Sequence, residues 1–380
     1  MEYKFSNLFS WSSGKPIIPT DGDIPVYGSN GIIGYTITPK YSNKIILGRV
    51  GAYCGSVEYC PNDFNATDNT LITTCDETKI LYPFAYYLLK QYRLNDFAGG
   101  AAQPLITQGL LKHLKCDIPD IVIQKRIADI LSAYDDLIEN NNRRIALLEK
   151  AAQELYKEWF VRFCFPGYEN TKYENGLPEG WEYIRFGNAI EIIDGDRGVN
   201  YPRQEEFYEE GECLFLNAGN VTKNGFDFSF CAYITKEKDQ LLRKGKLQTG
   251  DVVLTTRGTV GNVAFLNETM TFSPMRINSG MVILRNLGVV SPEYIYTALR
   301  HESLQKTMMM YASGSAQPQL PIKDMRRIKI IKADAKTMDK FTKYVADIYK
   351  QVSLIIMKNQ AISKQRDLLL PRLMSGKLEV

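Results

Sequence analysis

The chain has 380 residues, 44% hydrophobic and 23% charged, which is typical of a globular protein with room for two or three domains. No apolar run approaches the ~18–20 residues that span a bilayer, so the composition excludes an integral membrane protein. The net charge of +3 is only weakly basic, which fits nucleic-acid binding poorly if charge is the sole test.

Residues Met1–Ser10 are polar and aromatic and have no signal-peptide core. The seven cysteines are scattered and form no CxxC pair, which argues against a disulfide framework or a zinc site. We therefore expect a cytoplasmic protein.

The first segment, residues 1–122, has the pattern of a mixed α/β globule. Short β-type runs such as Lys44–Leu47 alternate with glycine turns, and a helix is expected around Phe84–Arg93. Arg49 stands in the turn of IILGRVGAYCGSV. Taken alone, that turn indicates a plain β-hairpin with an exposed arginine.

The second segment, residues 123–163, reads as one long helix. Its apolar residues recur at steps of four and three from Ile127 to Trp159, which is a heptad seam, and such a helix extends roughly 57 Å. Asn141 occupies one seam position. It is either a buried polar residue that fixes the register or a seam-edge residue that faces water.

The third segment, residues 164–333, begins with a loop rich in Gly, Pro and Asn and then repeats the first globule. The paired landmarks and their separations are Arg49 and Arg257 (208 residues), Asn69 and Asn278 (209), Phe84–Lys90 and Tyr294–Arg300 (210), and Gly99–Pro104 and Ser313–Pro318 (214). The separation only grows along the chain, as small insertions would produce. We therefore predict a duplicated domain.

The last segment, residues 334–380, repeats the helical seam, with Asn359 in one position and a charged break at Arg366. Two seams of equal length can pair with each other, and antiparallel pairing would relate the two globules by a pseudo-two-fold axis. The sequence thus predicts an α+β fold with two pseudo-repeated mixed α/β domains separated by two long antiparallel coiled-coil helices. The predicted seam residues are Leu131, Ile138, Ile145, Leu148 and Leu155 in the first helix and Val345, Val352, Ile355, Ile362 and Leu369 in the second.

Enzyme motifs are missing from the sequence. There is no GxxxxGK[ST] phosphate loop and no Asn/Asp-Pro-Pro-aromatic run of an amino-methyltransferase. The glycines of IPVYGSNGIIGY have the wrong spacing for a dinucleotide turn and favour strand–turn–strand. His113 and His301, the only histidines, fall in helical patterns. We expect a chain without catalytic residues, bound metal or cofactor of its own.

The chain resembles the specificity subunits of type I restriction–modification systems. The resemblance covers nearly the whole chain and is strongest in Gln124–Phe160, in the FPGYE…LPEGW linker, in the two Gln-Pro segments and in LLLPRLMSGKL (Leu368–Leu378). The short runs YGSNGIIGY and RVGAYCGSV are also typical of target-recognition domains in this family.

The resemblance implies a DNA-binding subunit with two target-recognition domains, each of which reads one half of a split site in double-stranded DNA. The two helices would join the domains and set the spacing between half-sites. Two modification subunits would bind the helices, carry S-adenosylmethionine and methylate adenine. A translocating restriction subunit would be a further partner, and no membrane would be involved.

Candidate DNA contacts follow from the repeat. Residues shared by both copies are expected to hold the fold or grip the DNA backbone, whereas residues that differ are expected to read bases. Lys44 and Thr255 lie near the Arg-Gly turns and are candidates for a phosphate or base contact. The shared residues are Arg49 and Arg257, Asn69 and Asn278, and Gln103 and Gln317; the differing ones are Tyr27, Asn30 and Tyr53 in one copy and Asn217, Asn220 and Thr256 in the other.

Two other classes of protein are also compatible with the sequence. A coiled-coil repeat scaffold that binds no DNA is favoured by the low net charge. A nuclease or methyltransferase with an unrecognised motif is the second alternative. Salt-dependent retention of the assembled protein on DNA would exclude the scaffold, and activity of the chain alone with magnesium or S-adenosylmethionine would establish the enzyme.

Overall fold

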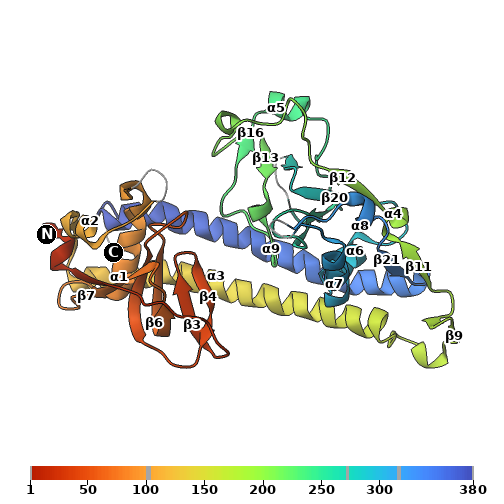
Figure 1. The fold of residues 1–380 in the computed structure, drawn as a ribbon, viewed down its shortest axis with the longest axis horizontal. Coiled ribbons are helices and arrows are strands. Elements are labelled where there is room, and N and C mark those ends of the chain that lie inside the picture. Colours follow the sequence, from red (N-terminus) through yellow and green to blue (C-terminus); the bar gives the residue numbers. More distant parts are fainter. Residues whose placement is uncertain (1, 100–103, 271–273, 315–317, 379–380) are drawn as a thin grey trace. The chain divides into compact units, whose positions relative to one another are not determined.

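The computed structural model describes residues 2–99, 104–270, 274–314 and 318–378 (Figure 1). The chain forms two compact units. Unit 1 comprises Met1–Ile138 with Ile362–Val380, and unit 2 comprises Glu139–Ala361. Two long helices, α3 (Ile121–Tyr156) and α9 (Ala335–Met374), contribute residues to both units. Within the described residues, no helix is both long and apolar enough to cross a membrane.

Unit 1 is built on a six-stranded sheet with the strand order β2-β7-β5-β6-β3-β4. One face carries Ile45 and Leu47 of β5, which pack with α1, and the other face carries Ile46 with Phe64. This alternation is the two-residue period of a strand buried on both sides. The elements are β1 (Glu2–Lys4), β2 (Phe9–Ser13), β3 (Ile24–Gly28), β4 (Gly31–Thr36), β5 (Tyr41–Gly48), β6 (Val57–Ala66), β7 (Thr70–Cys75), α1 (Tyr82–Gln91), α2 (Gln108–His113) and β8 (Lys115–Asp117).

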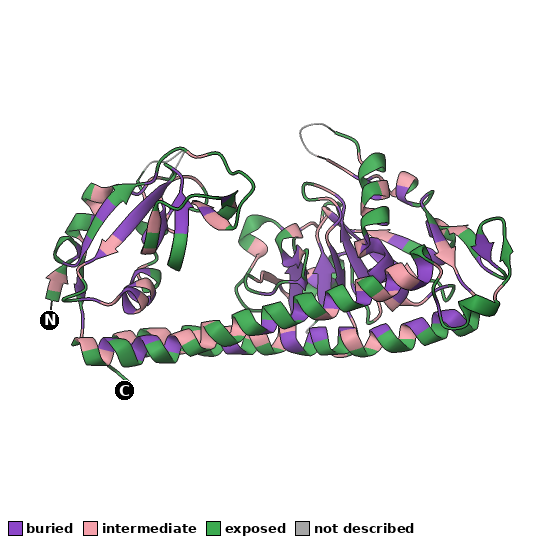
Figure 2. Ribbon diagram, turned by 90° about the horizontal axis from the view of Figure 1, so that it is seen from below, coloured by how far each residue is buried: buried purple, intermediate pink, exposed green. Residues whose placement is uncertain are grey.

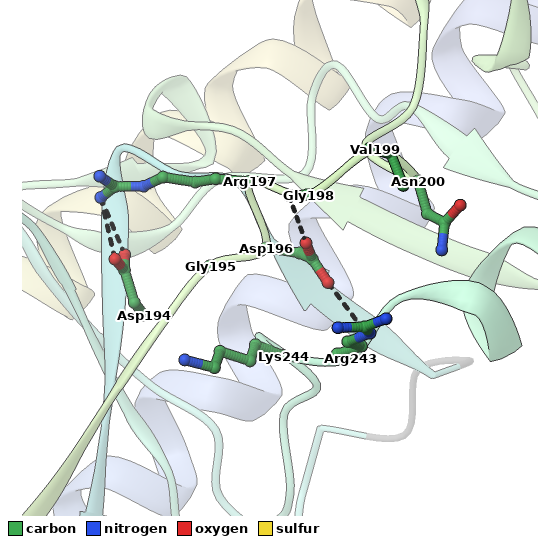
Figure 3. A pocket seen from close by; sticks show the side chains of 9 residues that line it. All are labelled: Asp194, Gly195, Asp196, Arg197, Gly198, Val199, Asn200, Arg243 and Lys244. Carbon is green, nitrogen blue, oxygen red and sulfur yellow. Dashed lines mark hydrogen bonds and ion pairs between the residues drawn. The ribbon is translucent and has the colours of Figure 1, made fainter.

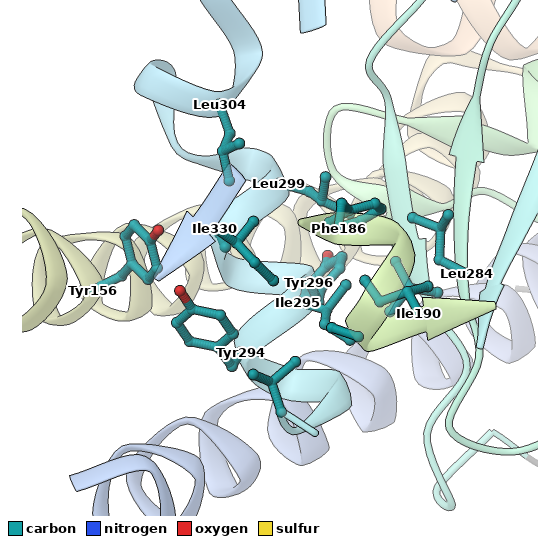
Figure 4. Packing of buried hydrophobic residues seen from close by; sticks show 14 of the residues in the cluster. Tyr156, Phe186, Ile190, Leu284, Tyr294, Ile295, Tyr296, Leu299, Leu304 and Ile330 are labelled. Atoms are coloured by element: carbon teal, nitrogen blue, oxygen red, sulfur yellow. The ribbon is translucent and has the colours of Figure 1, made fainter. Parts of the chain in front are cut away.

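Unit 2 has a four-stranded sheet, β12-β20-β17-β18, and a three-stranded sheet, β16-β13-β19. Its largest core joins the end of α3 to α6 and the sheet, with Tyr294 fully buried at its centre (Figure 4). The strands are β9 (Tyr173–Glu174), β10 (Leu177–Pro178), β11 (Glu182–Arg185), β12 (Ile190–Asp194), β13 (Cys213–Leu216), β14 (Val221–Thr222), β15 (Gly225–Phe226), β16 (Tyr233–Ile234), β17 (Val252–Thr255), β18 (Val263–Phe265), β19 (Met275–Ile277), β20 (Met281–Asn286) and β21 (Lys329–Lys332). The helices are α4 (Phe186–Ala189), α5 (Lys236–Leu241), α6 (Pro292–Arg300), α7 (Glu302–Tyr311) and α8 (Ile322–Met325).

The two units share one topology, which confirms the predicted duplication. The antiparallel set β2-β7-β5-β6 of unit 1 has the same order as β12-β20-β17-β18 of unit 2. The parallel pairing of β3 with β6 recurs as that of β13 with β19. One long strand, β6, therefore corresponds to two short ones, β18 and β19, with the segment 266–274 inserted between them. The helices expected around Phe84–Arg93 and Tyr294–Arg300 are α1 and α6.

The long helices carry the predicted seam. All ten predicted seam residues are buried or half-buried, and buried and exposed residues alternate along both helices (Figure 2). Facing residues have numbers that add up to 500, as in the hydrogen-bonded pair Asn141 and Asn359 and in the Trp159 and Phe341 rings, whose centroids lie 5.8 Å apart. Numbers that rise on one helix as they fall on the other mean that the pairing is antiparallel.

The seam asparagines face each other. Asn141 Nδ2 donates to Asn359 Oδ1 at 2.7 Å, and Asn359 Nδ2 donates to Asn142 Oδ1 at 2.9 Å. Asn141 is buried. Of the two alternatives that the sequence left open, it is therefore the buried polar residue and not a seam-edge residue that faces water. Because a buried amide is costly without a partner, this contact favours the one register in which the two asparagines meet.

Carboxylates on α3 bind the shorter helix that packs on the sheet of each unit. In unit 1, Asp135 accepts a hydrogen bond of 2.6 Å from the Tyr87 hydroxyl and pairs with the guanidinium of Arg366. The charged break in the second seam is thus neutralised by the opposite helix. In unit 2, the buried Glu149 binds Arg300 of α6 at 2.6 Å. In each unit, the globular part is therefore attached to α3 by a charge-assisted contact as well as by apolar packing.

Removing one asparagine should destabilise the seam more than removing both. We expect Asn359→Leu to lower the free energy of unfolding by about 1–3 kcal/mol, because the Asn141 amide stays buried without its partner. Asn141→Leu combined with Asn359→Leu should recover most of the loss. Urea unfolding measures both changes. The exposed neighbour Asn140 supplies the control, since Asn140→Leu should stay within about 0.5 kcal/mol of the parent. A double variant as unstable as the single one would contradict this role.

Candidate nucleic-acid interface

Several loops of unit 1 meet at one edge of its sheet, where β5 ends and β7 begins. The backbone N–H of Arg49 donates to the carbonyl of Asn69 at 2.9 Å, and the Ser29 hydroxyl donates to the same carbonyl at 2.6 Å. The backbone of Ile106 donates to the carbonyl of Arg49 at 3.0 Å. The turn after β3, the turn after β5, the turn before β7 and the segment before α2 are thereby joined. We call this the loop edge of unit 1.

Unit 2 has the equivalent loop edge, where β17 ends and β20 begins. The backbone N–H of Thr256 donates to the carbonyl of Gly280 at 2.9 Å, and that of Leu320 donates to the carbonyl of Thr256 at 3.0 Å. Asn262 Nδ2 donates to the carbonyl of Val221 at 2.9 Å and ties in the start of β14. The same kinds of loop therefore converge in both copies.

The structure brings part of the predicted unit 1 set together at this edge. Asn30, Tyr53 and Asn69 are exposed there, and Arg49 is half-exposed. Tyr27 is half-buried, with its ring 5.7 Å from that of Phe64. The predicted role of Lys44 needs correction. This lysine lies within β5, away from the loop edge, where it donates to the Tyr82 hydroxyl at 2.5 Å and lies 4.9 Å from the Tyr82 ring centroid.

In unit 2 the exposed members of the predicted set are fewer. Asn217 is exposed and accepts a hydrogen bond from Gly219, and Arg257 is half-exposed. Asn278 accepts one from Gly280 at 2.9 Å and shapes the turn before β20. Gln103 and Gln317 lie outside the described residues.

Three predicted DNA contacts in unit 2 have their polar groups used inside the protein. Asn220 is buried and donates to the carbonyls of Asp227 and Phe230. The buried hydroxyls of Thr255 and Thr256 donate to the carbonyls of Thr259 and Gly280. These side chains hold the loops in place and do not face outward, so the structure corrects their predicted role.

Backbone pairing also corrects which residues correspond between the copies. The carbonyls of Arg49 and Thr256 accept equivalent hydrogen bonds, from Ile106 and Leu320. Val50 pairs with Leu105 as Arg257 pairs with Gln319. Arg257 therefore corresponds to Val50, and the two arginines occupy adjacent positions of the turn. By the same criterion Asn69 corresponds to Gly280. The predicted matches of Arg49 with Arg257 and of Asn69 with Asn278 are therefore wrong. The Gly99 and Ser313 match holds, since Gly99 pairs with Leu105 as Ser313 pairs with Gln319.

Comparison with known proteins decides the family. The family model described as type I restriction modification DNA specificity domain matches residues 10–150 and 178–360. The chain belongs to this family. The first matched segment falls mainly in unit 1 and the second in unit 2, as expected for one specificity domain per copy.

Individual specificity subunits resemble the chain over most of its length. The MjaIX specificity subunit of Methanocaldococcus jannaschii is 27% identical over 310 residues, which cover 79% of this chain and 70% of the relative. The putative MjaX specificity subunit of the same organism is 26% identical over 361 residues, 92% of this chain and 79% of the relative. The crystal structure of the type I restriction–modification S subunit from M. genitalium has the same fold, with a TM-score of 0.56, 19% identity and coverage of 98% of this chain and 95% of that chain.

One glycine in each specificity domain was missed by the sequence comparison. A Cβ on Gly14 would lie 2.0 Å from the carbonyl oxygen of Thr67, and a Cβ on Gly195 would lie 2.2 Å from that of Asn278. Both glycines directly follow the first strand of the sheet, β2 or β12. Backbone crosses backbone there, and any side chain would push the loop away. A glycine directly after an alternating strand was the signal that could have revealed them.

A basic hollow beside Gly195 was also missed. It has a volume of about 570 Å³ and is lined by the loop Asp194–Asn200 together with Arg243 and Lys244 (Figure 3). The carboxylate of Asp196 accepts hydrogen bonds from the backbone of Gly198 at 2.8 Å and of Arg243 at 2.7 Å. Burial by itself raises the pKa of Asp196, but the backbone donors outweigh burial and lower this pKa below its ordinary value. The run DGDRG was the available signal.

The described residues contain no group of three or more His, Cys, Asp or Glu side chains that could hold a metal ion. What the two loop edges offer instead is exposed amides, a tyrosine, guanidinium groups and a basic hollow. Such groups form hydrogen bonds to phosphates and base edges.

Gly14→Ala should disrupt the loop edge of unit 1. Since the new Cβ would overlap the Thr67 carbonyl, we expect a loss of about 1–3 kcal/mol in the free energy of unfolding, measured by urea denaturation. The control is Gly109→Ala within α2, where the Cβ meets only the Thr107 hydroxyl at 3.8 Å and stability should stay equal or rise. Equal stability of the Gly14→Ala variant and the parent would show that the crossing can relax.

Proposed function

We propose that this chain is the DNA-recognition subunit of a type I restriction–modification complex and that each loop edge reads one half of a split site in double-stranded DNA. The observation that supports this most directly is one fold, repeated with the same strand register, that carries different side chains at equivalent edge positions. Arg49 in unit 1 corresponds to Thr256 in unit 2, and Arg257 in unit 2 corresponds to Val50 in unit 1. Two copies with the same strand topology and different side chains at their loop edges suit the recognition of two different half-sites.

We propose that the chain itself performs no chemistry. Two modification subunits would supply the methyl transfer to adenine and the S-adenosylmethionine, and a restriction subunit would join them in the cytoplasm. Exposed apolar residues on the long helices support a binding surface for such subunits. Leu147 of α3 is 69% exposed and Leu354 of α9 is 52% exposed. Methyl transfer by the isolated chain would contradict this division of work.

The corrected register moves the two arginines from the shared class to the class that differs between copies. Arg49 corresponds to a buried threonine and Arg257 to a valine, so neither is required by the common frame. A guanidinium binds guanine through two hydrogen bonds in the major groove. We therefore propose Arg49 and Arg257 as base readers, one in each half-site.

Exchanging one copy should change one half-site. Residues Tyr183–Lys332 begin in β11 and end in β21, and these strands pair with each other, so the segment forms a closed piece of the fold. We expect a chain with this segment from a relative, expressed with its modification subunit, to methylate sites in which one half is new and the other half and the spacer are unchanged. Methylome sequencing reads this result directly.

The reciprocal exchange of Tyr3–Pro119 is the matched control and should change the other half only. If both halves change after a single exchange, the two units do not read independently. If the assembled complex binds no DNA even at low salt, the alternative of a coiled-coil scaffold protein would be favoured instead.

Arg257→Ala should cost about 1–3 kcal/mol of binding to the cognate duplex and relax the preference at one base pair of one half-site. Arg49→Ala should do the same in the other half-site. Titration of duplexes changed at single positions, at two salt concentrations, measures both quantities. A uniform loss for all sequences with a salt slope lower by about one would instead identify a phosphate contact.

A further inference from the structure

The loop that follows the first strand of each sheet carries an exposed aliphatic side chain at the same position. Ile18 stands four residues after Gly14 and is 84% exposed, and Val199 stands four residues after Gly195 and is 100% exposed. The two glycines occupy equivalent backbone crossings, so the two tips stand at the same distance along the chain from equivalent points. A single exposed aliphatic residue needs no explanation, but one at the same spacing from an equivalent glycine in each of two divergent copies does.

Both loops are held firmly on either side of the tip. In unit 1, Lys15 donates from its backbone to the carbonyl of Ala66 at 3.2 Å, and Thr20 donates to that of Tyr35 at 2.8 Å. Pro19 packs so closely on β4 that a Cβ on Gly34 would lie 2.4 Å from the proline Cβ. Ile18 is therefore presented outward between two anchored segments.

The unit 2 loop uses different residues for the same purpose. Arg197 forms an ion pair of 3.0 Å with Asp194 and donates to the carbonyl of Ser279 at 3.2 Å. Asn200 Nδ2 donates to the carbonyl of Leu241 at 3.2 Å. In Figure 3, Val199 projects from the segment between Gly198 and Asn200. Val199 is therefore exposed although the loop that carries it is anchored on both sides.

The surroundings of the tips suit DNA. Both loops belong to the loop edges, through Ser279 in unit 2 and, in unit 1, through a hydrogen bond of 3.2 Å from Gly14 to the carbonyl of Thr70. Exposed Lys15 lies three residues before Ile18, and the hollow beside Val199 is lined by exposed Arg243 and Lys244. An aliphatic group within a cationic frame matches the DNA major groove, where thymine presents an apolar methyl group close to the phosphates.

We propose that Ile18 and Val199 are matched specificity residues, each of which contacts the 5-methyl group of a thymine in its own half-site. This inference rests on the proposed function, since it assumes that the loop edges face DNA. It adds an apolar component to recognition by hydrogen bonds. Because the anchoring residues differ, the two tips can reach thymines at different positions of the two half-sites.

The test combines a protein change with removal of the methyl group from DNA. The wild-type chain, assembled with its modification subunits, should bind about fourfold more weakly when one thymine of the Val199 half-site is replaced by deoxyuridine, because one buried methyl group is lost. Val199→Ala should bind the thymine duplex about five- to tenfold more weakly and no longer distinguish thymine from deoxyuridine. Ile18→Ala should do the same for the other half-site only.

Leu287→Ala is the matched control. Leu287 is 55% exposed and follows the opposite end of β20, away from the loop edge, so its removal should change neither affinity nor the response to deoxyuridine. The inference is overturned if Val199→Ala keeps the response, if it binds as the parent does, or if it instead loses the modification subunits. It is also overturned if the half-site contains no thymine. Absence of any sequence preference in the wild-type complex would count against the proposed function itself.

Discussion

The antiparallel pairing of α3 with α9 is the constraint on which both units depend. In each unit a carboxylate of α3 binds a shorter helix, Asp135 binding α1 in unit 1 and Glu149 binding α6 in unit 2, and each unit buries parts of both long helices. A change of register would therefore alter the base on which each recognition fold is built. The amides of Asn141 and Asn359 favour one register because no other alignment lets them meet.

The position of the asparagine pair also distinguishes this pairing from its alternatives. Under the repeat, Asn141 corresponds to Ile355 and Asn359 to Ile145, so the layer related to the asparagine layer is a pair of isoleucines. If two copies of α3 from different chains paired in the same manner, each Asn141 would face an Ile145. The buried amide would then lack a partner, at a cost of about 1–3 kcal/mol for each. The seam thus favours pairing of unlike helices within one chain.

The sequence predicted the parts of the fold that repeat locally. Heptad steps and strand alternation are visible over ten to thirty residues, so the seam, the hairpin at Tyr27 and the helices α1 and α6 could be located. The contact of Asn141 with Asn359 joins residues 218 positions apart, and only the choice between buried and solvent-facing could be stated beforehand. Whether a polar side chain faces outward depends on its tertiary neighbours, which is why Lys44 and Asn220 were assigned to DNA although Tyr82 and two carbonyl groups bind them.

The predicted correspondence between the two copies was wrong where residues were matched by type and not by backbone position. Arg49 and Arg257 both precede a turn glycine closely, and matching them by type shifted the alignment by one residue. Gly14 and Gly195 would have been better markers, because the space around them excludes every other residue, whereas an arginine at a turn is replaceable. In a duplicated sequence, a glycine required by close backbone packing is therefore a more reliable marker of equivalent positions than a polar residue.

The asparagine pair also bears on inheritance. Its two members are encoded on either side of the second recognition domain, and each is useful only if the other is present. A recombination event with both crossovers between the codons for Asn141 and Asn359 replaces that domain and keeps the pair. An event with one crossover in this interval joins two parental helices, and the hybrid folds well only if both parents carry the polar layer at the same level. Gene segments for new target preferences are therefore exchanged most safely as inserts bounded by the helices, and the helices themselves are inherited as a unit.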